Sequence, residues 1–299
     1  DAIEFYTPDP QQGYIRAVAG DQVPFRERAI AYRHVAFPVD TPAQSRQTFY
    51  LRFATETAMN ISLNLWPGAT FYEAIDGQLL VFGFIYGLLT LATLYCLINA
   101  LLIHELIYIH IALTILGALG YSLGIHGFGF QYLWPENLWL QSVCVPFLLN
   151  ICYSFGMFYS RQFLNLRKTS PRSDKVIIAF AVFCLAMAAL SLVLNYGLVI
   201  RVATVSSIVL GFAILWIGSI CFLDGNKSAR YFLLGWMVLV IGMVTFALKS
   251  LGLIASNTFT EWMPDFGFAG LALFSTLAQS DRFFQTQRRH ITEQGALMK

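Results

Sequence analysis

One run of the sequence, residues 79–103, contains no Asp, Glu, Lys or Arg, and it constrains the fold more than any other feature. A helix rises about 1.5 Å per residue, so a run of this length reaches roughly 37 Å. The hydrocarbon core of a bilayer is about 30 Å thick and needs about 20 apolar residues to cross it. The run therefore predicts a transmembrane helix, which separates a polar head, residues 1–78, from an apolar body, residues 79–281.

The composition agrees with an integral membrane protein. Hydrophobic residues make up 57% of the chain and charged residues only 12%, whereas soluble domains carry about 25% charged residues. The net charge of +2 is too small to indicate a nucleic-acid partner, and none is expected. All cysteines lie in apolar runs and are predicted to be small packing residues: Cys96, Cys144, Cys152, Cys184 and Cys221.

Six further apolar runs follow the first and predict a membrane all-α bundle of seven helices. They cover residues 106–127, 139–160, 176–198, 202–222, 231–253 and 264–280. An odd number of crossings places the two ends of the body on opposite sides of the membrane. The remaining residues, 282–299, are predicted to start a cytoplasmic linker or signalling helix.

Lys and Arg are distributed unevenly between the two sides of this bundle. With the head outside, the inner segments (104–105, 161–175, 224–230 and the tail after 281) carry eleven of them, and the short outer loops carry only Arg201. Because cytoplasmic loops are enriched in Lys and Arg, we expect the head outside the cell and the C-terminus in the cytoplasm. Asp1 and Lys299 are interpreted as the ends of a fragment, with a signal peptide expected upstream.

The head alternates apolar and polar residues with period two, which is typical of half-buried strands. The clearest alternation covers 59–65, and 49–53, 35–39 and a weaker 14–18 repeat it. They predict an antiparallel sheet, which further strands upstream are expected to complete into an all-β sandwich. Such a module is either a structural cap or a ligand sensor, and no catalytic constellation is present in it.

Ionisable groups near membrane spans are candidates for function, and here they are His104, Glu105, His110, His126, Lys249 and Asp265. His104 and Glu105 are expected to face water at an inner turn, and Lys249 to reach the interface. His110 is expected to contact a neighbouring helix, and Asp265 to sit at the positive end of the last helix. No catalytic, cofactor or metal site is predicted, and the ligand-binding residues stay unknown.

Two further patterns concern packing of the bundle. Small residues four apart, at Gly83 with Gly87 and at Gly120 with Gly124, favour close helix contacts. An aromatic belt is expected at the outer boundary from Tyr132, Trp134, Trp139, Tyr196 and Trp262.

Several strings resemble a known family. They are GDQVPFRER at 20–28, FP at 37–38, FYLRF at 49–53, LNLW at 63–66, the Gly83-x-x-x-Gly87 pair and GFGFQYLWP at 127–135. Over residues 13–281 the chain is similar to bacterial seven-transmembrane receptors with diverse intracellular signalling modules, with part of the second type of extracellular sensor domain.

The resemblance implies a sensory receptor of the bacterial inner membrane, whose periplasmic head is the C-terminal part of a jelly-roll-like all-β sandwich. Its head would bind a carbohydrate or another small molecule, and its helices would relay the signal to a histidine kinase of a two-component system, a diguanylate cyclase or a phosphatase. That output domain is missing here, so no enzyme activity is expected in this chain. A homodimer is expected, because residues seven apart favour a coiled coil, although a frayed tail remains open: Leu277, Phe284, Ile291 and Met298.

Two other classes of protein remain open from the sequence. A transporter or channel with a docking head needs polar groups along a path at mid-membrane. The spans offer only a few: Thr90, Asn99, Thr114, Ser154, Thr204 and Ser206. An intramembrane enzyme needs two convergent ionisable groups at one depth, and His110 has no evident carboxylate at its level.

Overall fold

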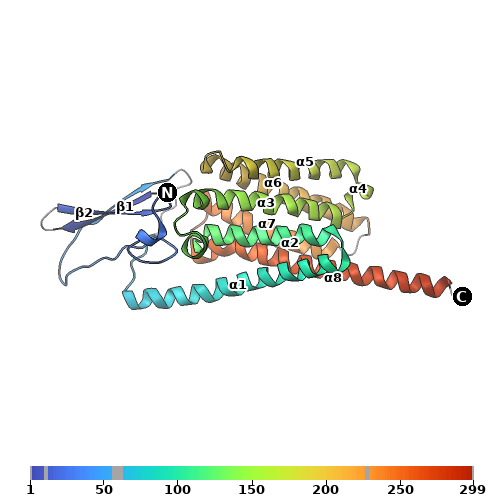
Figure 1. Ribbon diagram of the computed structural model, residues 1–299, viewed down its shortest axis with the longest axis horizontal. Helices are drawn as coiled ribbons and strands as arrows, with labels where there is room; N and C mark the ends of the chain where they lie inside the picture. The colour runs from blue at the N-terminus through green and yellow to red at the C-terminus, as the bar shows by residue number, and fades with distance from the viewer. Residues whose placement is uncertain (1, 10–12, 56–62, 226–228, 298–299) are drawn as a thin grey trace.

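A computed structural model describes residues 2–9, 13–55, 63–225 and 229–297, with side chains of the last helix described up to Gln285. A small sheet lies at one end, a helical bundle occupies the middle, and the last helix extends far beyond the bundle at the other end (Figure 1). The fold class expected from the sequence, a membrane helical bundle preceded by a β domain, is confirmed.

The head contains β1 (Ala2–Asp9), β2 (Gly13–Gly20), a 3₁₀ turn η1 (Phe25–Glu27) and β3 (Tyr50–Ala54). The helices are α1 (Gly68–Ile103), α2 (Leu106–Ile125), α3 (Leu138–Phe163), the short α4 (Leu166–Thr169), α5 (Pro171–Leu190), α6 (Tyr196–Leu223), α7 (Ala229–Ser250) and α8 (Thr258–Leu297). A π-helical turn, η2 (Gly129–Leu133), connects α2 to α3.

The described strands form one antiparallel sheet in the order β2-β1-β3. Its register places Tyr6 of β1 between Arg16 of β2 and Tyr50 of β3. The predicted strands 14–18 and 49–53 are confirmed, within a residue or two, as β2 and β3. The central strand β1 was not predicted, although its alternation of Ile3 and Phe5 with polar neighbours has the period of a strand.

The other two predicted strands are not confirmed. The segment 35–39 is wrong as a strand, because it pairs with no ladder. Its alternation reflects packing, since the Phe37 ring stacks on Phe5 at 4.8 Å between centroids, and Pro38 has no N–H to give to a ladder. Of the predicted strand 59–65, residues 59–62 lie outside the described residues, and 63–65 form no strand.

Among the described residues, six helices are long and apolar enough to cross a membrane: α1, α2, α3, α5, α6 and α7. The seventh long helix of the bundle is α8, which carries acidic residues near its start.

Several helix boundaries differ from those expected from the sequence. α1 begins at Gly68 rather than 79, α5 ends at Leu190 rather than 198, and α8 starts at Thr258 rather than 264 and continues to Leu297.

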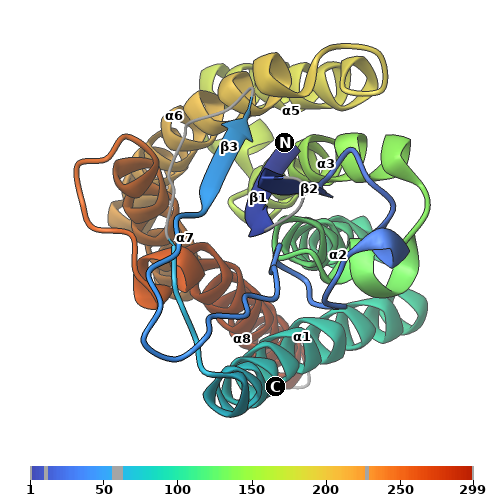
Figure 2. The ribbon, with the colours of Figure 1, turned by 90° about the vertical axis from the view of Figure 1, so that its left-hand side faces the viewer.

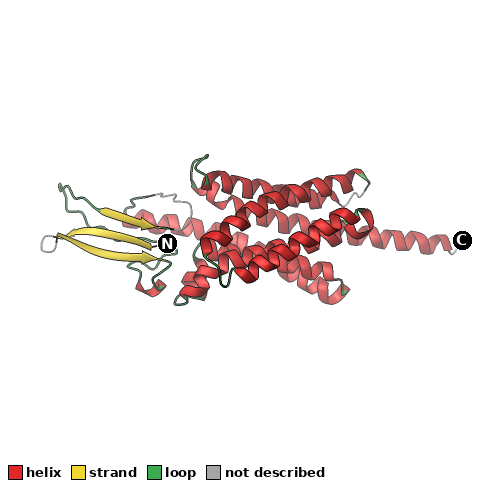
Figure 3. Cartoon of the chain, turned by 90° about the horizontal axis from the view of Figure 1, so that it is seen from above, coloured by secondary structure: helices red, strands yellow, loops and turns green. Residues whose placement is uncertain are grey.

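The seven long helices close into a ring, as the end-on view shows (Figure 2). Neighbours along the chain pack together, and α8 returns to contact both α1 and α2. α3 also contacts α6, so it lies toward the inside of the bundle. The core is rich in aromatic rings there, with Phe163 of α3 stacked on Phe232 of α7 at 5.2 Å between centroids. Seen from above, the sheet lies beyond one end of the bundle, and the start of α1 extends alongside it (Figure 3).

The two glycine pairs behave differently. A Cβ on Gly120 would lie 2.8 Å from Leu148 of α3, and one on Gly124 would lie 2.9 Å from Val145. This predicted close contact is therefore confirmed. Gly83 and Gly87 have nothing within 4 Å of such an atom. They lie on the exposed side of α1, so the predicted contact is wrong within this chain.

The predicted packing role of the cysteines is confirmed, because all five are buried and free. The aromatic belt is only partly as expected. Tyr132 and Trp139 are exposed on the outer surface, but Trp134 and Tyr196 pack against the core. Trp262 turns inward against Phe82, with 5.1 Å between ring centroids.

We expect Gly242→Ala to lower the melting temperature of the purified protein. The added Cβ would lie 2.4 Å from the Met263 carbonyl oxygen, and backbone of α8 cannot rotate away, so overpacking of about 1–3 kcal/mol is expected. The matched control is Gly87→Ala, where the space is open and Ala favours the helix by up to about 1 kcal/mol. Equal melting temperatures for the two variants would contradict this packing of α7 on α8.

Candidate functional site

A buried arginine joins the head to the mouth of the bundle. Arg33 belongs to the linker between η1 and β3, yet only 6% of its surface is exposed. Its Nη2 donates to Oε1 of Gln78 on α1 at 2.6 Å, and its Nη1 donates to the carbonyl oxygen of His126 at the end of α2 at 3.2 Å. Burial lowers the pKa of this guanidinium from its ordinary value. The linker is thus fastened to two helices by one side chain.

Aromatic rings surround the guanidinium. Its Cζ lies 5.0 Å from the ring centroids of both Phe82 and Phe128, a distance at which the face of a ring attracts a cation. Phe82 is itself 1% exposed and lies 4.6 Å from the His126 ring. These contacts replace the water that Arg33 loses and hold its position against α1.

The second part of the site is a buried carboxylate on α8. Asp265 is 1% exposed, and its Oδ2 lies 2.7 Å from Nε2 of His126. Its Oδ1 accepts a hydrogen bond from the Ser122 hydroxyl of α2, and that hydroxyl also lies 3.3 Å from the Tyr86 hydroxyl of α1. Because a buried charge needs partners to be stable, these groups hold α1, α2 and α8 together at one level.

Arg33 and Asp265 meet at the same residue, His126. The backbone of His126 accepts from Arg33, and its ring contacts Asp265. We call Arg33, Gln78, His126, Ser122, Tyr86 and Asp265 the junction cluster. It forms a continuous chain of hydrogen bonds from the head linker to the helix that leaves the bundle at the other end.

The linker is anchored at a second place, on the α2–α3 connection. The backbone N–H of Phe25 donates to the Pro135 carbonyl at 2.8 Å, and the Phe25 ring meets Phe130 of η2 edge-on at 5.8 Å. Gly127, with φ of +77°, lets the linker backbone at Arg33 approach the end of α2 closely, because a Cβ at Gly127 would lie 2.6 Å from the Arg33 carbonyl oxygen. The head therefore rests on the bundle at several points rather than on a free tether.

The sheet presents one polar and aromatic face. Glu4 in the centre accepts from the Tyr6 hydroxyl at 2.7 Å and from Arg16 at 2.5 Å, and Arg52 lies 3.6 Å away. The opposite face carries Phe5, which is buried between the rings of Phe37 and Phe49.

This polar face also carries exposed rings. Tyr14 and Tyr50 are 41% and 56% exposed, and their rings meet edge-on at 5.2 Å. The hydrogen bond from Tyr6 and then that from Arg16 lower the pKa of Glu4 below its ordinary value. Any stability that Glu4 contributes is thus complete above its ordinary pKa and disappears only as the pH falls through the lowered one.

The residues singled out from the sequence are only partly brought together. His126 and Asp265 meet, which the sequence did not show, and Asp265 lies inside α8 rather than at its start. Lys249 does not reach out to the interface as expected. Its side chain is only 13% exposed and pairs with Glu261 at 3.4 Å.

The remaining candidates lie toward the other end of the bundle. His110 contacts a neighbouring helix as expected, since its ring lies 5.5 Å from that of Phe158 on α3. His104 and Glu105 are exposed at the α1–α2 turn, as predicted. Arg33 and Gln78 were missed altogether, because nothing in a loop or a helix start distinguishes them from solvated residues.

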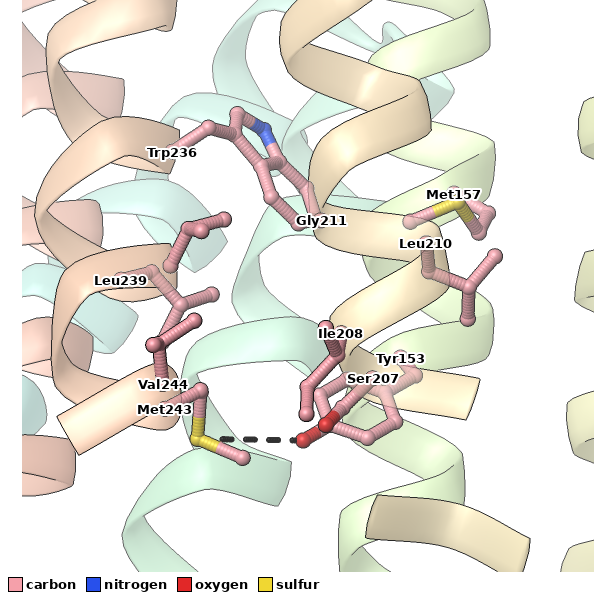
Figure 4. A pocket seen from close by; sticks show the side chains of 11 residues that line it. Tyr153, Met157, Ser207, Ile208, Leu210, Gly211, Trp236, Leu239, Met243 and Val244 are labelled. Carbon is pink, nitrogen blue, oxygen red and sulfur yellow. Dashed lines mark hydrogen bonds between the residues drawn. The ribbon is translucent and has the colours of Figure 1, made fainter. Parts of the chain in front are cut away.

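An internal cavity lies between α3, α6 and α7 (Figure 4). Its volume is about 10 Å³, and its lining is mostly apolar, with Trp236 and Met243 on α7 and Gly211 on α6. The Tyr153 hydroxyl points to the Met243 sulfur, 3.9 Å away. A space of this size holds about one water molecule, so it gives no room to a transported solute.

We expect Asp265→Ala to destabilise the protein strongly, by about 2–4 kcal/mol, because His126 and Ser122 lose a buried acceptor. Glu261→Ala is the matched control on the same helix. Glu261 is 43% exposed in its pair with the less exposed Lys249, so water can replace its carboxylate beside the lysine, and we expect a loss of only about 1 kcal/mol. Thermal unfolding in detergent compares the two variants. A larger loss for Glu261→Ala would show that the junction cluster is not a structural centre.

Comparison with known proteins gives a family. The search of curated proteins and the search of solved structures found no match. The family model described as 7TMR-DISM extracellular 2 matches residues 1–67. The model described as 7TM diverse intracellular signalling matches residues 78–282, which is more than half of the chain. The chain is therefore a membrane protein with an extracellular N-terminal part, and it belongs to the family of seven-transmembrane receptors with diverse intracellular signalling.

Proposed function

We propose that this chain is the sensing and membrane part of a bacterial receptor of the inner membrane. In this proposal a small molecule or carbohydrate binds the periplasmic head, and the helices relay binding to a cytoplasmic signalling module beyond residue 299. That module is a histidine kinase, a diguanylate cyclase or a phosphatase. The family supports the receptor class, and the junction cluster supports the relay.

The observation that carries the relay is the hydrogen-bonded path through His126. A shift of the linker at Arg33 acts on His126 through its backbone and on α1 through Gln78. His126 acts on Asp265 of α8, and α8 continues as one helix to Leu297. A rigid helix passes a displacement at one end to the other, so the path ends where an output module would begin.

The polar face of the sheet supports the proposal that the head binds a sugar-like ligand. Exposed tyrosine rings suit the apolar faces of a sugar, and the guanidinium groups of Arg16 and Arg52 suit hydroxyl or carboxylate oxygens. A ligand acts only through a difference in affinity between two states of the protein. The strand β3, which carries Tyr50 and Arg52, follows the linker directly, so it is well placed to transmit such a difference.

A homodimer fits this proposal. On the part of α8 whose side chains are described, Leu277 and Phe284 of the heptad series are 44% and 64% exposed. Exposed apolar groups seven apart form the seam of a coiled coil when a second copy is present. Ile291 falls where side chains are not described, and Met298 lies outside the described residues.

An intramembrane enzyme is less well supported. His126 and Asp265 do converge, but Asp265 is engaged by Ser122 as well as by His126, and Phe82 and Arg33 cover the histidine. A transporter is less well supported because the cavity among α3, α6 and α7 is so small. Neither alternative explains a long α8 tied to the head.

We expect reporter fusions to place the C-terminus in the cytoplasm. Green fluorescent protein fused after Lys299 should fluoresce, and alkaline phosphatase fused at the same residue should be inactive in intact cells. The inner ends of the helices carry the excess of Lys and Arg that keeps them in the cytoplasm. An active phosphatase together with a dark fluorescent fusion would contradict the orientation and the relay.

We expect a panel of mono- and disaccharides to contain at least one member that raises the melting temperature of the protein, since binding to the folded state stabilises it. Tyr50→Ala should abolish this shift. The matched control is Tyr72→Ala, because Tyr72 is 64% exposed on α1, away from the sheet. No stabilising sugar, or equal effects of the two variants, would contradict a carbohydrate site on this face.

The same sugar tests the relay. A fluorophore on Phe284→Cys should change its emission when the sugar binds, because the five native cysteines are buried and only the new thiol reacts. In the Arg33→Gln variant, sugar binding should persist while the change at α8 is lost. Persistence of both signals in that variant would contradict the path through the junction cluster.

A further inference from the structure

A second, charged cavity lies at the opposite end of the bundle from the head. Its volume is about 400 Å³, and it is open to the surface. The α1–α2 turn, the end of α3 with the residues before and within α4, and α8 where it leaves the bundle all contribute to it. The residues that matter here are Glu105, Leu106, Arg161, Gln162, Arg167 and Arg282.

The lining is cationic. Three arginines, Arg161, Arg167 and Arg282, line the cavity together with one acidic residue, Glu105, so the net charge of the lining is positive. Asp174 fixes Arg161 from outside the cavity, by accepting from its Nε at 2.6 Å and its Nη2 at 3.1 Å. A guanidinium has five N–H donors, so the remaining donors of Arg161 are held in a defined orientation. The amide of Gln162 adds a neutral donor.

Guanidinium groups arranged in this way suit a phosphate. Their planar forks match pairs of phosphate oxygens and bind them through charge-assisted hydrogen bonds. The shape and charge of the cavity therefore indicate a phosphate group as its occupant.

The surroundings of the cavity indicate where this phosphate comes from. Leu106 lines the cavity and is 62% exposed, and Leu101 and Leu102 on the last turn of α1 are 75% and 73% exposed. This surface lies where the apolar length of α1 ends, which is the level of the lipid head groups. In a bilayer these leucines lie beside acyl chains, so the cavity is within reach of the phosphate of a lipid whose chain packs on them.

We propose that this cavity binds an anionic phospholipid, with its phosphate among Arg161, Arg167 and Arg282 and an acyl chain along the exposed leucines. The lipid would join the α1–α2 turn, the end of α3 and α8 at the point where α8 leaves the bundle. This site is separate from the head and from the junction cluster, so it stands whether or not the head binds a sugar.

The test compares lipids of different charge. The protein is placed in nanodiscs of phosphatidylcholine alone or of phosphatidylcholine with phosphatidylglycerol, and its melting temperature is measured. Titration of phosphatidylglycerol into detergent, followed by native mass spectrometry, gives the affinity. We expect phosphatidylglycerol to stabilise the protein and to bind as a discrete single lipid. The double variant Arg167→Gln with Arg282→Gln should bind it roughly tenfold or more weakly.

The matched control is Lys168→Gln with Arg172→Gln, which removes the same charge from the same end of the bundle but outside the cavity. It should change the affinity less than about twofold. Equal loss in the two double variants would mean general attraction to a charged surface and would overturn the site. Unchanged melting temperatures in pure phosphatidylcholine show that both variants are folded.

A further arm adds inorganic phosphate to the protein in phosphatidylcholine nanodiscs. We expect no stabilisation from it at millimolar concentration, because the acyl chain contributes part of the binding. Stabilisation by inorganic phosphate equal to that by phosphatidylglycerol would overturn the lipid as occupant. Equal stabilisation by phosphatidylcholine and phosphatidylglycerol would overturn the role of charge.

Discussion

The carboxylate of Asp265 is almost completely enclosed by α1, α2 and α8, and such a charge is stable only where donors surround it. His126 and Ser122 supply them from α2, and Tyr86 of α1 contacts Ser122 in turn. This requirement fixes the rotation of α8, because only one face of that helix can carry Asp265 into the group. Since α8 is also the helix that closes the ring, the arrangement of the whole mouth of the bundle depends on this interaction.

The head depends on the same place from the other side. Arg33 is a buried cation whose partners are the backbone of His126, the amide of Gln78 and two aromatic rings. The extension of α1 beyond its apolar part gives the linker a second surface, where Phe71 meets Tyr32 with 5.3 Å between ring centroids. The sheet is thus attached to the bundle by contacts that have direction, which a flexible tether would lack. Directional contacts are what a receptor needs if a change in its head is to reach its helices.

The long helices explain how a local change could act at a distance. α1 and α8 both exceed the thickness of a bilayer, α1 on the side of the head and α8 on the opposite side. They contact each other within the bundle. Near the end of the bundle away from the head, the Tyr95 hydroxyl of α1 lies 2.9 Å from the Ser280 hydroxyl of α8. A bias set at the junction cluster and a lipid held in the cationic cavity would therefore act on the same helix, at the two ends of its part within the bundle.

Much of the fold could be predicted from the sequence, because the relevant forces are local. Uncharged runs of sufficient length have to be helices in a bilayer, where every backbone group needs an internal partner. Period-two alternation located β2 and β3. The strand at 35–39 was predicted wrongly because alternation reports packing and not strand pairing: Phe37 is half-buried against Phe5 without any strand partner among the described residues. Helix ends were also mispredicted, because the first turns of α1, residues 68–78, contain Glu73 and Asp76 and do not belong to the continuous apolar run.

The sequence by itself determined the number of long helices, the apolar part of each and a head of strands, since length, hydropathy and alternation act within single segments. Only the tertiary structure decided that His126 meets Asp265, that Arg33 enters the bundle, and that three arginines from separate segments share one cavity. These residues are far apart along the chain, and a lone charge in a sequence does not indicate its partner. The partner is set by which helix faces turn toward one another, and that follows from the packing of the bundle as a whole.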